Sequence, residues 1–278
     1  MTIDRRTLVC VIATATLIAS TAAQAQECKP RLPDSALVKP GTLVMSTNPT
    51  LPPLQFINQQ GDLKGMRVEL GVEIAKRLCL KPEYVRIEFS AMIPGLQAGR
   101  WDMINTGIFF TEERAKMMQM IPYEDQAISI SVATKDASKV AKPEDLAGKA
   151  VGVEIGGFEE RKIKELDAEL QKKGVAGMTI RTFDNFATAY QALRAGQVDA
   201  VVSIDAVAKE YQDRGDFSRV LHGLFPTPVS LAFKNKLLAD EVLRVLKEMK
   251  ADGSYDKLFK AYGLEPFAAE LVIKGPTN

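Results

Sequence analysis

The chain has 278 residues, of which 46% are hydrophobic and 26% are charged, a composition typical of folded globular proteins. This composition excludes a disordered chain, a collagen and a coiled coil, while the length allows one large domain or two medium ones. Because 36 basic residues face 35 acidic ones, the net charge of +1 provides no overall attraction to nucleic acid or to an anionic membrane.

Residues 1–25 are typical of a cleaved secretory signal peptide. Arg5 and Arg6 precede an apolar run at 8–19, and Ala23-Gln24-Ala25 is a small-x-small cleavage signal. The apolar run is shorter than the roughly 20 residues of a membrane-spanning helix, which disfavours a membrane anchor. We therefore expect cleavage after Ala25 and a periplasmic location.

Two cysteines, Cys28 and Cys79, remain after the cleavage removes Cys10. In an oxidising compartment two thiols favour one disulfide, which here closes a loop of about 50 residues. The alternatives are a buried free thiol at Cys79 with an exposed Cys28, or a lipid anchor on Cys28. The bulky polar residues before Cys28 disfavour the lipid anchor.

Strand-like and helix-like segments alternate along the rest of the chain, which favours an α/β fold. The apolar segment 42–47 predicts a strand, Leu70, Ile74 and Leu78 mark one face of a helix, and the alternation at 85–89 predicts a second strand. Further strands are expected at 103–108, 128–134, 150–155, 178–183, 200–204 and 229–233. Helices are expected at 159–173, 186–195, 237–250 and 254–262.

An internal repeat with a spacing of 97 positions is the most informative feature. Phe89, Leu96, Ala98, Gly99 and Asp102 recur as Phe186, Leu193, Ala195, Gly196 and Asp199. Each copy predicts a helix, a glycine C-cap, an aspartate turn and an apolar strand. Two copies imply two similar βαβ lobes. Because ligands of such sheets lie beyond the carboxyl ends of the strands, we expect a ligand in the cleft between the lobes.

The residue types do not suggest an enzyme. The single histidine, His222, leaves no basis for a histidine-based metal cluster and little for a Ser/Cys–His triad. No glycine motif for nucleotide phosphates follows a predicted strand. The acidic pairs Glu112-Glu113 and Glu159-Glu160 are interpreted as charges that favour a helix N-terminus. No metal and no cofactor is therefore expected.

The residue types fit the binding of a small carboxylate better than they fit catalysis. Arg114 follows a predicted strand and can hold a carboxylate through two parallel hydrogen bonds. The alternative for Arg114 is a surface ion pair with Glu112 or Glu113. Phe89 can form a wall of a binding site, and by its spacing it can equally belong to the core.

Seven stretches between Thr42 and Gly263 follow one known pattern in order and spacing. They are TLVMSTNPTLPPLQF (42–56), GDLKGMRVELGVEIAKRL (61–78), MIPGLQAGRWDMI (92–104), TEERAK (111–116), EDLAGKAVGVEIG (144–156), LRAGQVDAVV (193–202) and MKADGSYDKLFKAYG (249–263). This pattern resembles the polar amino-acid family (family 3) of periplasmic solute-binding proteins, the receptors of ABC importers.

The resemblance implies a two-lobed periplasmic-binding-protein fold of type II, with two hinge crossovers near 127–131 and 226–230. Lobe 1 would comprise 26-128 and 228-278, and lobe 2 would comprise 129-227. The implied partners are a small carboxylate ligand and an ABC permease in the inner membrane, with no nucleic acid, and the receptor is expected to be a monomer.

The resemblance also implies which residues bind the ligand. Arg114 matches the arginine that holds the ligand carboxylate, Phe89 and Leu51 match apolar walls, and Glu154 matches a position that can contact the ligand side chain. The remaining expected contacts are Asn48, Thr106, Gly107, Phe109, Gly156, Gly157, Phe158 and Asp205.

Several positions depart from the family pattern. Asn48 replaces an acidic residue, Phe109 stands where a hydroxyl residue is usual, and Gly157 replaces a threonine. Ile204 stands where an aspartate usually holds the ligand ammonium, and Asp205 follows one position later. We therefore expect the carboxylate contact to be kept and the ammonium contact to be lost or rebuilt.

Because of these departures, the sequence does not identify the ligand. Three hypotheses are an N-substituted amino acid such as an opine, a cyclic or zwitterionic derivative, and an organic acid without an amine. Glu154 or Asp205 is the candidate acid for a secondary ammonium. The alternative functions are a periplasmic enzyme similar to cyclohexadienyl dehydratases, with Glu154 or Asp205 as general acid, and a stand-alone ligand sensor.

Overall fold

The computed structural model describes residues 28–276, so the expected signal peptide lies outside the described residues. The strands are β1 (Thr42–Thr47), β2 (Thr50–Leu51), β3 (Gln55–Ile57), β4 (Leu63–Lys64), β5 (Lys81–Arg86), β6 (Met103–Phe109), β7 (Gln119–Val132), β8 (Ala150–Glu154), β9 (Thr179–Phe183), β10 (Ala200–Ile204) and β11 (Ser218–Phe233). The α-helices are α1 (Met66–Arg77), α2 (Met92–Gln97), α3 (Glu112–Ala115), α4 (Phe158–Lys172), α5 (Phe186–Arg194), α6 (Asp205–Asp213), α7 (Lys236–Ala251) and α8 (Ser254–Ala261).

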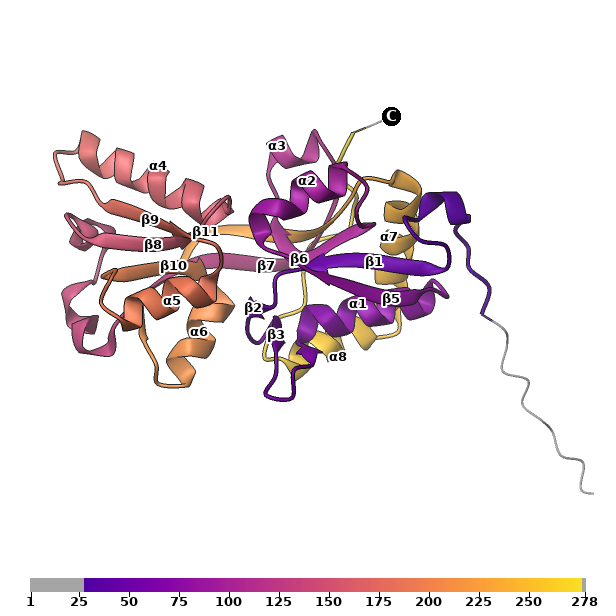
Figure 1. Cartoon of the computed structure of the whole chain (residues 1–278), viewed down its shortest axis with the longest axis horizontal. Helices are drawn as coiled ribbons and strands as arrows, with labels where there is room; N and C mark the ends of the chain where they lie inside the picture. The colour runs from indigo at the N-terminus through magenta and orange to yellow at the C-terminus, as the bar shows by residue number, and fades with distance from the viewer. Residues whose placement is uncertain (1–27, 277–278) are drawn as a thin grey trace, which may run out of the picture.

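One eight-stranded sheet, in the order β5-β1-β6-β11-β7-β10-β8-β9, runs through the whole molecule. Its two outer parts are parallel: β1 pairs with β5 and β6, and β8 pairs with β9 and β10. We call the part with β1 the first half and the part with β8 the second half. Helices cover both faces of the sheet in each half (Figure 1). The expected two-lobed α/β fold is confirmed.

The internal repeat corresponds to equivalent turns in the two halves. Asp102 precedes β6, and its carboxylate accepts a hydrogen bond at 2.8 Å from the backbone amide of Val44 in the neighbouring strand β1. Asp199 precedes β10, and its carboxylate accepts a hydrogen bond at 2.8 Å from the amide of Ala150 in the neighbouring strand β8. Each aspartate therefore joins a helix–strand turn to the adjacent parallel strand.

Two strands, β7 and β11, connect the halves and are longer than expected. The sequence predicts strands at 128–134 and 229–233, whereas β7 and β11 each begin several residues earlier and pair antiparallel from Ser218↔Val132 to Phe233↔Gln119. The expected hinge crossovers near 127–131 and 226–230 lie within these two strands (Figure 1). The lobe boundaries themselves stay a prediction.

Two other local elements differ from the sequence analysis. The strand predicted at 85–89 ends at Arg86, and Phe89 lies in a short 3-10 turn before α2. Asp205 begins helix α6, which the sequence reading missed. In both places the chain leaves the sheet at the carboxyl end of a strand, where an alternating pattern no longer describes the backbone.

The N-terminal segment is held by the expected disulfide. Cys28 and Cys79 are bonded, with their Cα atoms 5.4 Å apart, so Cys79 is not a free thiol. The apolar stripe of α8 is core as expected, because Tyr255 and Phe259 are fully buried. Within residues 28–276, no helix is long and apolar enough to cross a membrane.

Candidate functional site

A small cavity lies between the two halves. Its lining includes nine expected ligand contacts, namely Asn48, Leu51, Phe89, Thr106, Gly107, Phe109, Arg114, Glu154 and Phe158, together with Glu159, Phe186 and Ile204. Its free volume is about 10 Å³, close to the smallest volume that holds one water molecule. A larger ligand therefore enters only when the halves separate. The role of these residues as ligand contacts stays a prediction.

The cavity forms where strands of both halves end. Asn48 follows β1, and Phe109 is the last residue of β6, both in the first half. Glu154 and Ile204 are the last residues of β8 and β10 in the second half. Because the carboxyl ends of parallel strands are the usual place for ligands in such sheets, the topology brings these residues together.

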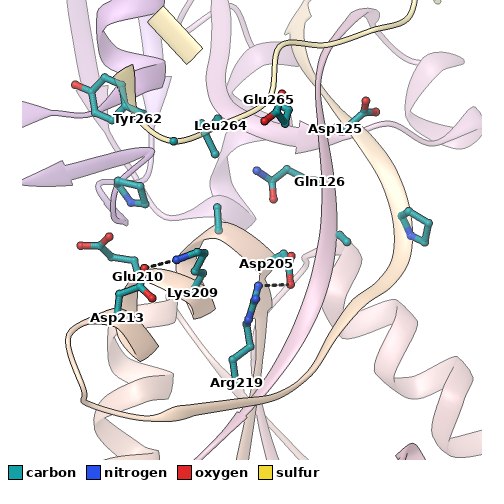
Figure 2. Close-up of a pocket in the computed structure, with 15 residues that line it drawn as sticks. Asp125, Gln126, Asp205, Lys209, Glu210, Asp213, Arg219, Tyr262, Leu264 and Glu265 are labelled. Carbon is teal, nitrogen blue, oxygen red and sulfur yellow. Dashed lines mark hydrogen bonds and ion pairs between the residues drawn. The ribbon is translucent and has the colours of Figure 1, made fainter. Parts of the chain in front are cut away.

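Asp205 does not line this cavity, which corrects the expectation from the sequence. Strand β10 ends at Ile204, whose side chain faces the cavity, and the backbone turns into α6 at the next residue. The Asp205 carboxylate instead forms an ion pair with Arg219 at 3.1 Å and accepts a hydrogen bond from Ser129. It lines a separate groove of about 610 Å³ between α6 and the segment after α8 (Figure 2).

Gly156 and Gly157 also lie outside the cavity. They line a more open groove of about 660 Å³ that shares Arg114 and Phe158 with it. Gly157 is the N-cap of α4, and a Cβ atom there would lie 2.6 Å from Oε2 of Glu159. The absence of a side chain at this position thus lets the Glu159 carboxylate fold back over the helix start.

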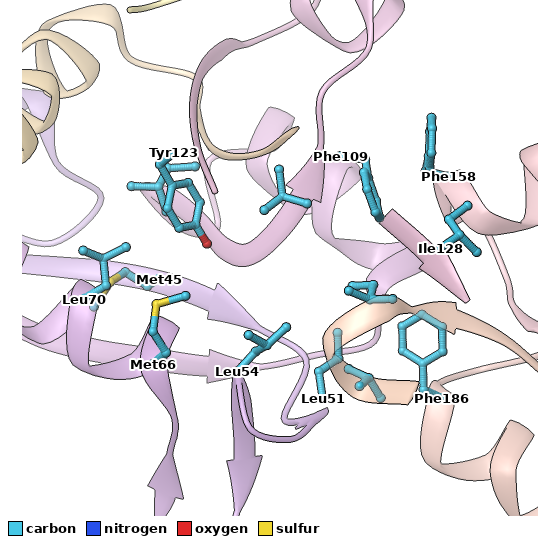
Figure 3. Close-up of a cluster of buried hydrophobic side chains, with 14 of the residues drawn as sticks. Met45, Leu51, Leu54, Met66, Leu70, Phe109, Tyr123, Ile128, Phe158 and Phe186 are labelled. Atoms are coloured by element: carbon cyan, nitrogen blue, oxygen red, sulfur yellow. The ribbon is translucent and has the colours of Figure 1, made fainter. Parts of the chain in front are cut away.

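Two aromatic rings close the cavity from opposite halves. Phe109 of β6 and Phe158 of α4 stack with ring centroids 4.5 Å apart and an interplanar angle of 22°. Figure 3 shows this pair beside Leu51 and Phe186, at the place where the two halves meet. Stacked rings exclude water, so the charged groups around them lie in a poorly solvated environment.

Arg114 is held by its own half. The Thr111 hydroxyl caps α3 by accepting a hydrogen bond from the Arg114 amide at 3.1 Å, and the guanidinium donates to the Phe109 carbonyl at 2.9 Å. Burial lowers the pKa of Arg114 to about 10, so it is protonated at neutral pH. Glu113 pairs with Arg161 at 3.1 Å, and none of the ion pairs among residues 28–276 includes Arg114. The expected alternative, a surface ion pair, is wrong.

Phe89 lines the cavity and also belongs to the core, and its expected role as a wall of a binding site stays a prediction. Its ring lies under the Arg114 guanidinium, 5.4 Å from the guanidinium carbon, and lines the cavity. The same side chain is 9% exposed and belongs to a core cluster with Met92 and Leu96 of α2. One face of the ring thus supports the site while the rest is packed.

Two buried carboxylates face the cavity from the second half. Glu154 and Glu159 are each 3% exposed. Burial, followed by the charges of Glu159 and Glu88, raises the pKa of Glu154 well above the usual carboxyl range. A hydrogen bond at 2.7 Å from the Asn48 amide to Glu154 opposes this rise and links the two halves. Burial also raises the pKa of Glu159. A hydrogen bond from its own backbone amide and the positive charge of Arg114 lower this pKa and partly offset the effect of burial.

Glu159 was missed because its charge was assigned to the helix start. The spacing of α4 contains the signal, since Ile163, Leu166 and Leu170 follow Glu159 by 4, 7 and 11 positions and are buried or half-buried. A residue on that stripe lies on the buried face of the helix. An acidic residue at the buried end of an apolar stripe is therefore a candidate site residue.

A second buried charge, Arg67, was missed in the same way. It precedes Leu70 and Ile74 on the buried face of α1 and is fully buried. Its guanidinium forms a bidentate ion pair with Glu124 of β7, at 2.9 and 3.1 Å. A Cβ atom at Gly107, where φ is +73°, would lie 2.1 Å from the guanidinium carbon, so glycine is required there.

Comparisons with known proteins agree on one family. The model for bacterial extracellular solute-binding proteins, family 3, matches residues 43–265. The histidine-binding periplasmic protein of Escherichia coli K12 is 30% identical over 238 residues, which cover 80% of this chain and 88% of that protein.

Solved structures of two ancestral proteins are also similar. An ancestral arginine-binding protein bound to arginine is 35% identical, with a TM-score of 0.73 over 80% of this chain and 98% of that one. An ancestral amino acid-binding protein described as a precursor of cyclohexadienyl dehydratase is 32% identical, with a TM-score of 0.72 over 80% of this chain and 95% of that one.

Proposed function

Because this chain belongs to the bacterial extracellular solute-binding proteins of family 3, we propose that it is a periplasmic receptor of an ABC importer and binds an amino-acid-like ligand by its carboxylate. The relatives are named for different amino acids, histidine and arginine. The family thus indicates the class of ligand, and the residues that line the cavity determine which amino-acid-like molecule is bound. None of the relatives reported above is named for an opine, so that hypothesis has no support.

Arg114 is the observation that carries this proposal. Its guanidinium is buried at a cavity between two halves, charged at neutral pH, and outside every ion pair of the described residues. A buried cation without a charged partner is unfavourable, whereas a ligand carboxylate would supply two charge-assisted hydrogen bonds. Phe89 beneath the guanidinium keeps it in position for that contact.

Closure of the two halves follows from contacts of one ligand with both. Arg114 and Phe109 belong to the first half, and Glu154 and Phe158 to the second. A ligand that contacts all of them stabilises the closed arrangement relative to the open one, which contacts with one half cannot do. The closed form is the one that a permease distinguishes from the unliganded receptor.

The test is calorimetric titration of the purified chain with the common L-amino acids and with simple carboxylic acids. Arg114→Gln should lower the affinity of the best ligand by roughly 100-fold, because charge-assisted hydrogen bonds contribute about 1.5–3 kcal/mol each. Arg244→Gln is the matched control, since Arg244 lies on α7 outside the cavity and pairs with Glu241 and Glu248 of the same helix. Unchanged affinity in Arg114→Gln, or no binding of any carboxylate, would contradict the proposal.

An enzymatic function is a second candidate because one similar structure is a precursor of a cyclohexadienyl dehydratase. The buried Glu154, whose pKa burial raises above the usual carboxyl range, is the residue that can serve as general acid. Incubation with a cyclohexadienyl carboxylic acid tests this function. Turnover that Glu154→Gln abolishes would favour the enzyme, and binding without turnover would favour the receptor.

The partner follows from the family and is tested in cells. Deletion of the gene should abolish uptake of the ligand identified by titration if the chain serves an ABC permease. Unchanged uptake with loss of a ligand-dependent response would indicate a sensor instead. The expected monomer stays a prediction that light scattering can check.

A further inference from the structure

The buried pair of Arg67 and Glu124 is connected to the cavity by hydrogen bonds. Arg67 does not line the cavity, but its guanidinium donates to the backbone carbonyl of Thr106, which does. The same nitrogen donates to the side-chain oxygen of Gln55 at 3.4 Å. Glu124 accepts from the guanidinium and belongs to β7, one of the two strands that connect the halves. The pair therefore links a connecting strand to a wall of the cavity.

Arg67 determines which way the Gln55 amide faces. A guanidinium only donates hydrogen bonds, so the Gln55 oxygen must face Arg67 and the amide nitrogen must face away from it. That nitrogen donates to the Thr106 carbonyl at 3.0 Å and to the Thr106 hydroxyl at 2.8 Å. Because Gln55 is fully buried, bulk water does not compete for these hydrogen bonds.

The Thr106 hydroxyl is left as a donor. It accepts from the Gln55 side chain and, at 3.3 Å, from the backbone amide of Asn48. A hydroxyl has two lone pairs and one proton, so two incoming donors leave it able only to donate. No residue within 28–276 accepts this proton. Because Thr106 is buried and lines the cavity, the proton is available to a molecule bound there.

A carboxylate held by Arg114 is an acceptor that fits this donor. Arg114 and Thr106 line the same small cavity. A carboxylate has about four lone-pair sites, so two hydrogen bonds from a guanidinium leave about two sites for other donors. A hydrogen bond from a hydroxyl to a carboxylate is charge-assisted and stronger than one between neutral groups.

We propose that Arg67 and Gln55 are positioning residues for ligand binding, which keep the Thr106 hydroxyl as a donor to the ligand carboxylate beside Arg114. This inference rests on the proposed receptor function and assigns to it two residues that do not line the cavity. Without Arg67 the Gln55 amide can turn, and its oxygen then accepts the Thr106 proton that the ligand would otherwise receive. Glu124 keeps Arg67 in place from the connecting strand β7.

The test is calorimetric titration with the tightest-binding compound among the common L-amino acids and simple carboxylic acids. Arg67→Met/Glu124→Leu removes both charges and leaves neither unpaired. It should still bind roughly tenfold more weakly than the wild type, because one hydrogen bond to a carboxylate is lost. Thr106→Val removes the hydroxyl itself and should cause a similar loss.

A combination of these changes separates positioning from a purely structural role. In Arg67→Met/Glu124→Leu the Thr106 hydroxyl no longer serves the ligand, so adding Thr106→Val should weaken binding by less than about twofold further. Arg77→Met/Glu73→Leu, which removes an ion pair from the same helix α1, is the matched control and should bind as the wild type does. Circular dichroism and urea denaturation show that each variant is folded.

Gln55→Glu tests the same step with the pair of Arg67 and Glu124 intact. It keeps an acceptor toward Arg67 and replaces the amide donor by an acceptor for the Thr106 proton. Adding Thr106→Val should therefore have little further effect in this variant as well.

Two results would contradict the inference in different ways. Wild-type affinity in folded Arg67→Met/Glu124→Leu, or losses that multiply in full when Thr106→Val is added to either variant, would overturn the positioning role and leave the receptor function standing. No binding of any carboxylate by the wild type would overturn the receptor function and this inference with it.

Discussion

Burial sets the protonation of the ionisable side chains around the cavity. The Arg114 guanidinium keeps its charge at neutral pH because even its lowered pKa is about 10. Burial moves the pKa of Glu154 in the direction that favours the protonated acid. The same loss of water thus disfavours the charged form of both side chains.

Replacement of Glu154 by Gln should change how stability depends on pH. Because the folded protein holds the proton of Glu154 more tightly than the unfolded chain, the free energy of unfolding falls as pH rises from about 4, the usual carboxyl range, toward the raised pKa. Glu154→Gln accepts the same hydrogen bond from Asn48 without a charge, so this decrease should be smaller.

Urea denaturation between acidic and neutral pH measures this effect. If Glu154→Gln raises the free energy of unfolding at neutral pH by about 1 kcal/mol, its melting temperature should exceed that of the wild type by roughly 2–4 °C in a protein of this size. Glu165→Gln, at an exposed site of the same half, serves as the control. An identical pH dependence in wild type and Glu154→Gln would show that the carboxyl group is not perturbed.

The buried pair Arg67–Glu124 provides a second residue-scale prediction. Both side chains are at most 1% exposed, so Arg67→Met should destabilise the fold by about 3–5 kcal/mol because Glu124 is left as an uncompensated buried charge. The double variant Arg67→Met/Glu124→Leu should recover most of this loss, as measured by urea denaturation.

Arg77 is the matched control on the same helix α1. Its side chain is 21% exposed and pairs with Glu73 and Asp252. Arg77→Met should therefore lower stability by less than about 1 kcal/mol. Equal losses for Arg67→Met and Arg77→Met would refute the argument from burial.

At the scale of elements, the helix–turn–strand unit is the repeated building block. Gly99 and Gly196 both adopt left-handed backbone angles, with φ of +69° and +70°, at the ends of α2 and α5. This conformation favours glycine and terminates the helix. Such caps are local signals, which is why the ends of α4, α5, α7 and α8 lie within about two residues of their predicted positions.

The longest strands were the hardest elements to predict. Strand β7 contains Pro122, and β11 contains Pro226 and Pro228, residues that disfavour a central strand. The structure accommodates them through repeated shifts of register between β7 and β11. Their length reflects pairing between segments about 100 residues apart, which a local pattern does not contain.

Loss of the two repeated aspartates should have unequal effects. Asp102 is buried and accepts hydrogen bonds from the amides of Val38 and Val44, whereas Asp199 is exposed and accepts one from Ala150. Asp102→Ala leaves two backbone amides without partners and should lower stability by about 2–4 kcal/mol, and Asp199→Ala by about 1 kcal/mol. Thermal denaturation of both variants checks the order, and a larger loss for Asp199→Ala would contradict it.

At the scale of the molecule, a few contacts hold the halves together. Asn48 donates to Glu154 at 2.7 Å, and Asn185 donates to Glu88 at 3.1 Å. The ring of Phe158 stacks on that of Phe109. Each contact joins one residue of the first half to one of the second. Their removal should favour separation of the halves.

Phe158→Ala should shift the unliganded protein toward an open form. A stacked aromatic pair contributes about 0.5–1.5 kcal/mol beyond its buried area, so the open-to-closed ratio should rise by roughly twofold to tenfold. Small-angle scattering should record a larger radius of gyration. Phe183→Ala, which removes a ring packed within the second half, is the control. Equal radii for wild type and Phe158→Ala would show that the ring pair does not hold the halves together.

The sequence by itself determined the alternation of strands and helices, the two similar halves, the family, and most of the positions that line the cavity. These features depend on periodicity, on caps and on motif spacing, which act over a few residues. Only the tertiary structure decided that Asp205 faces another groove, that Glu159 and Arg67 are buried, and that Phe109 and Phe158 stack. Burial of a charge and contact between rings depend on which surfaces meet across the sheet, and those surfaces come from segments some 50 to 100 residues apart.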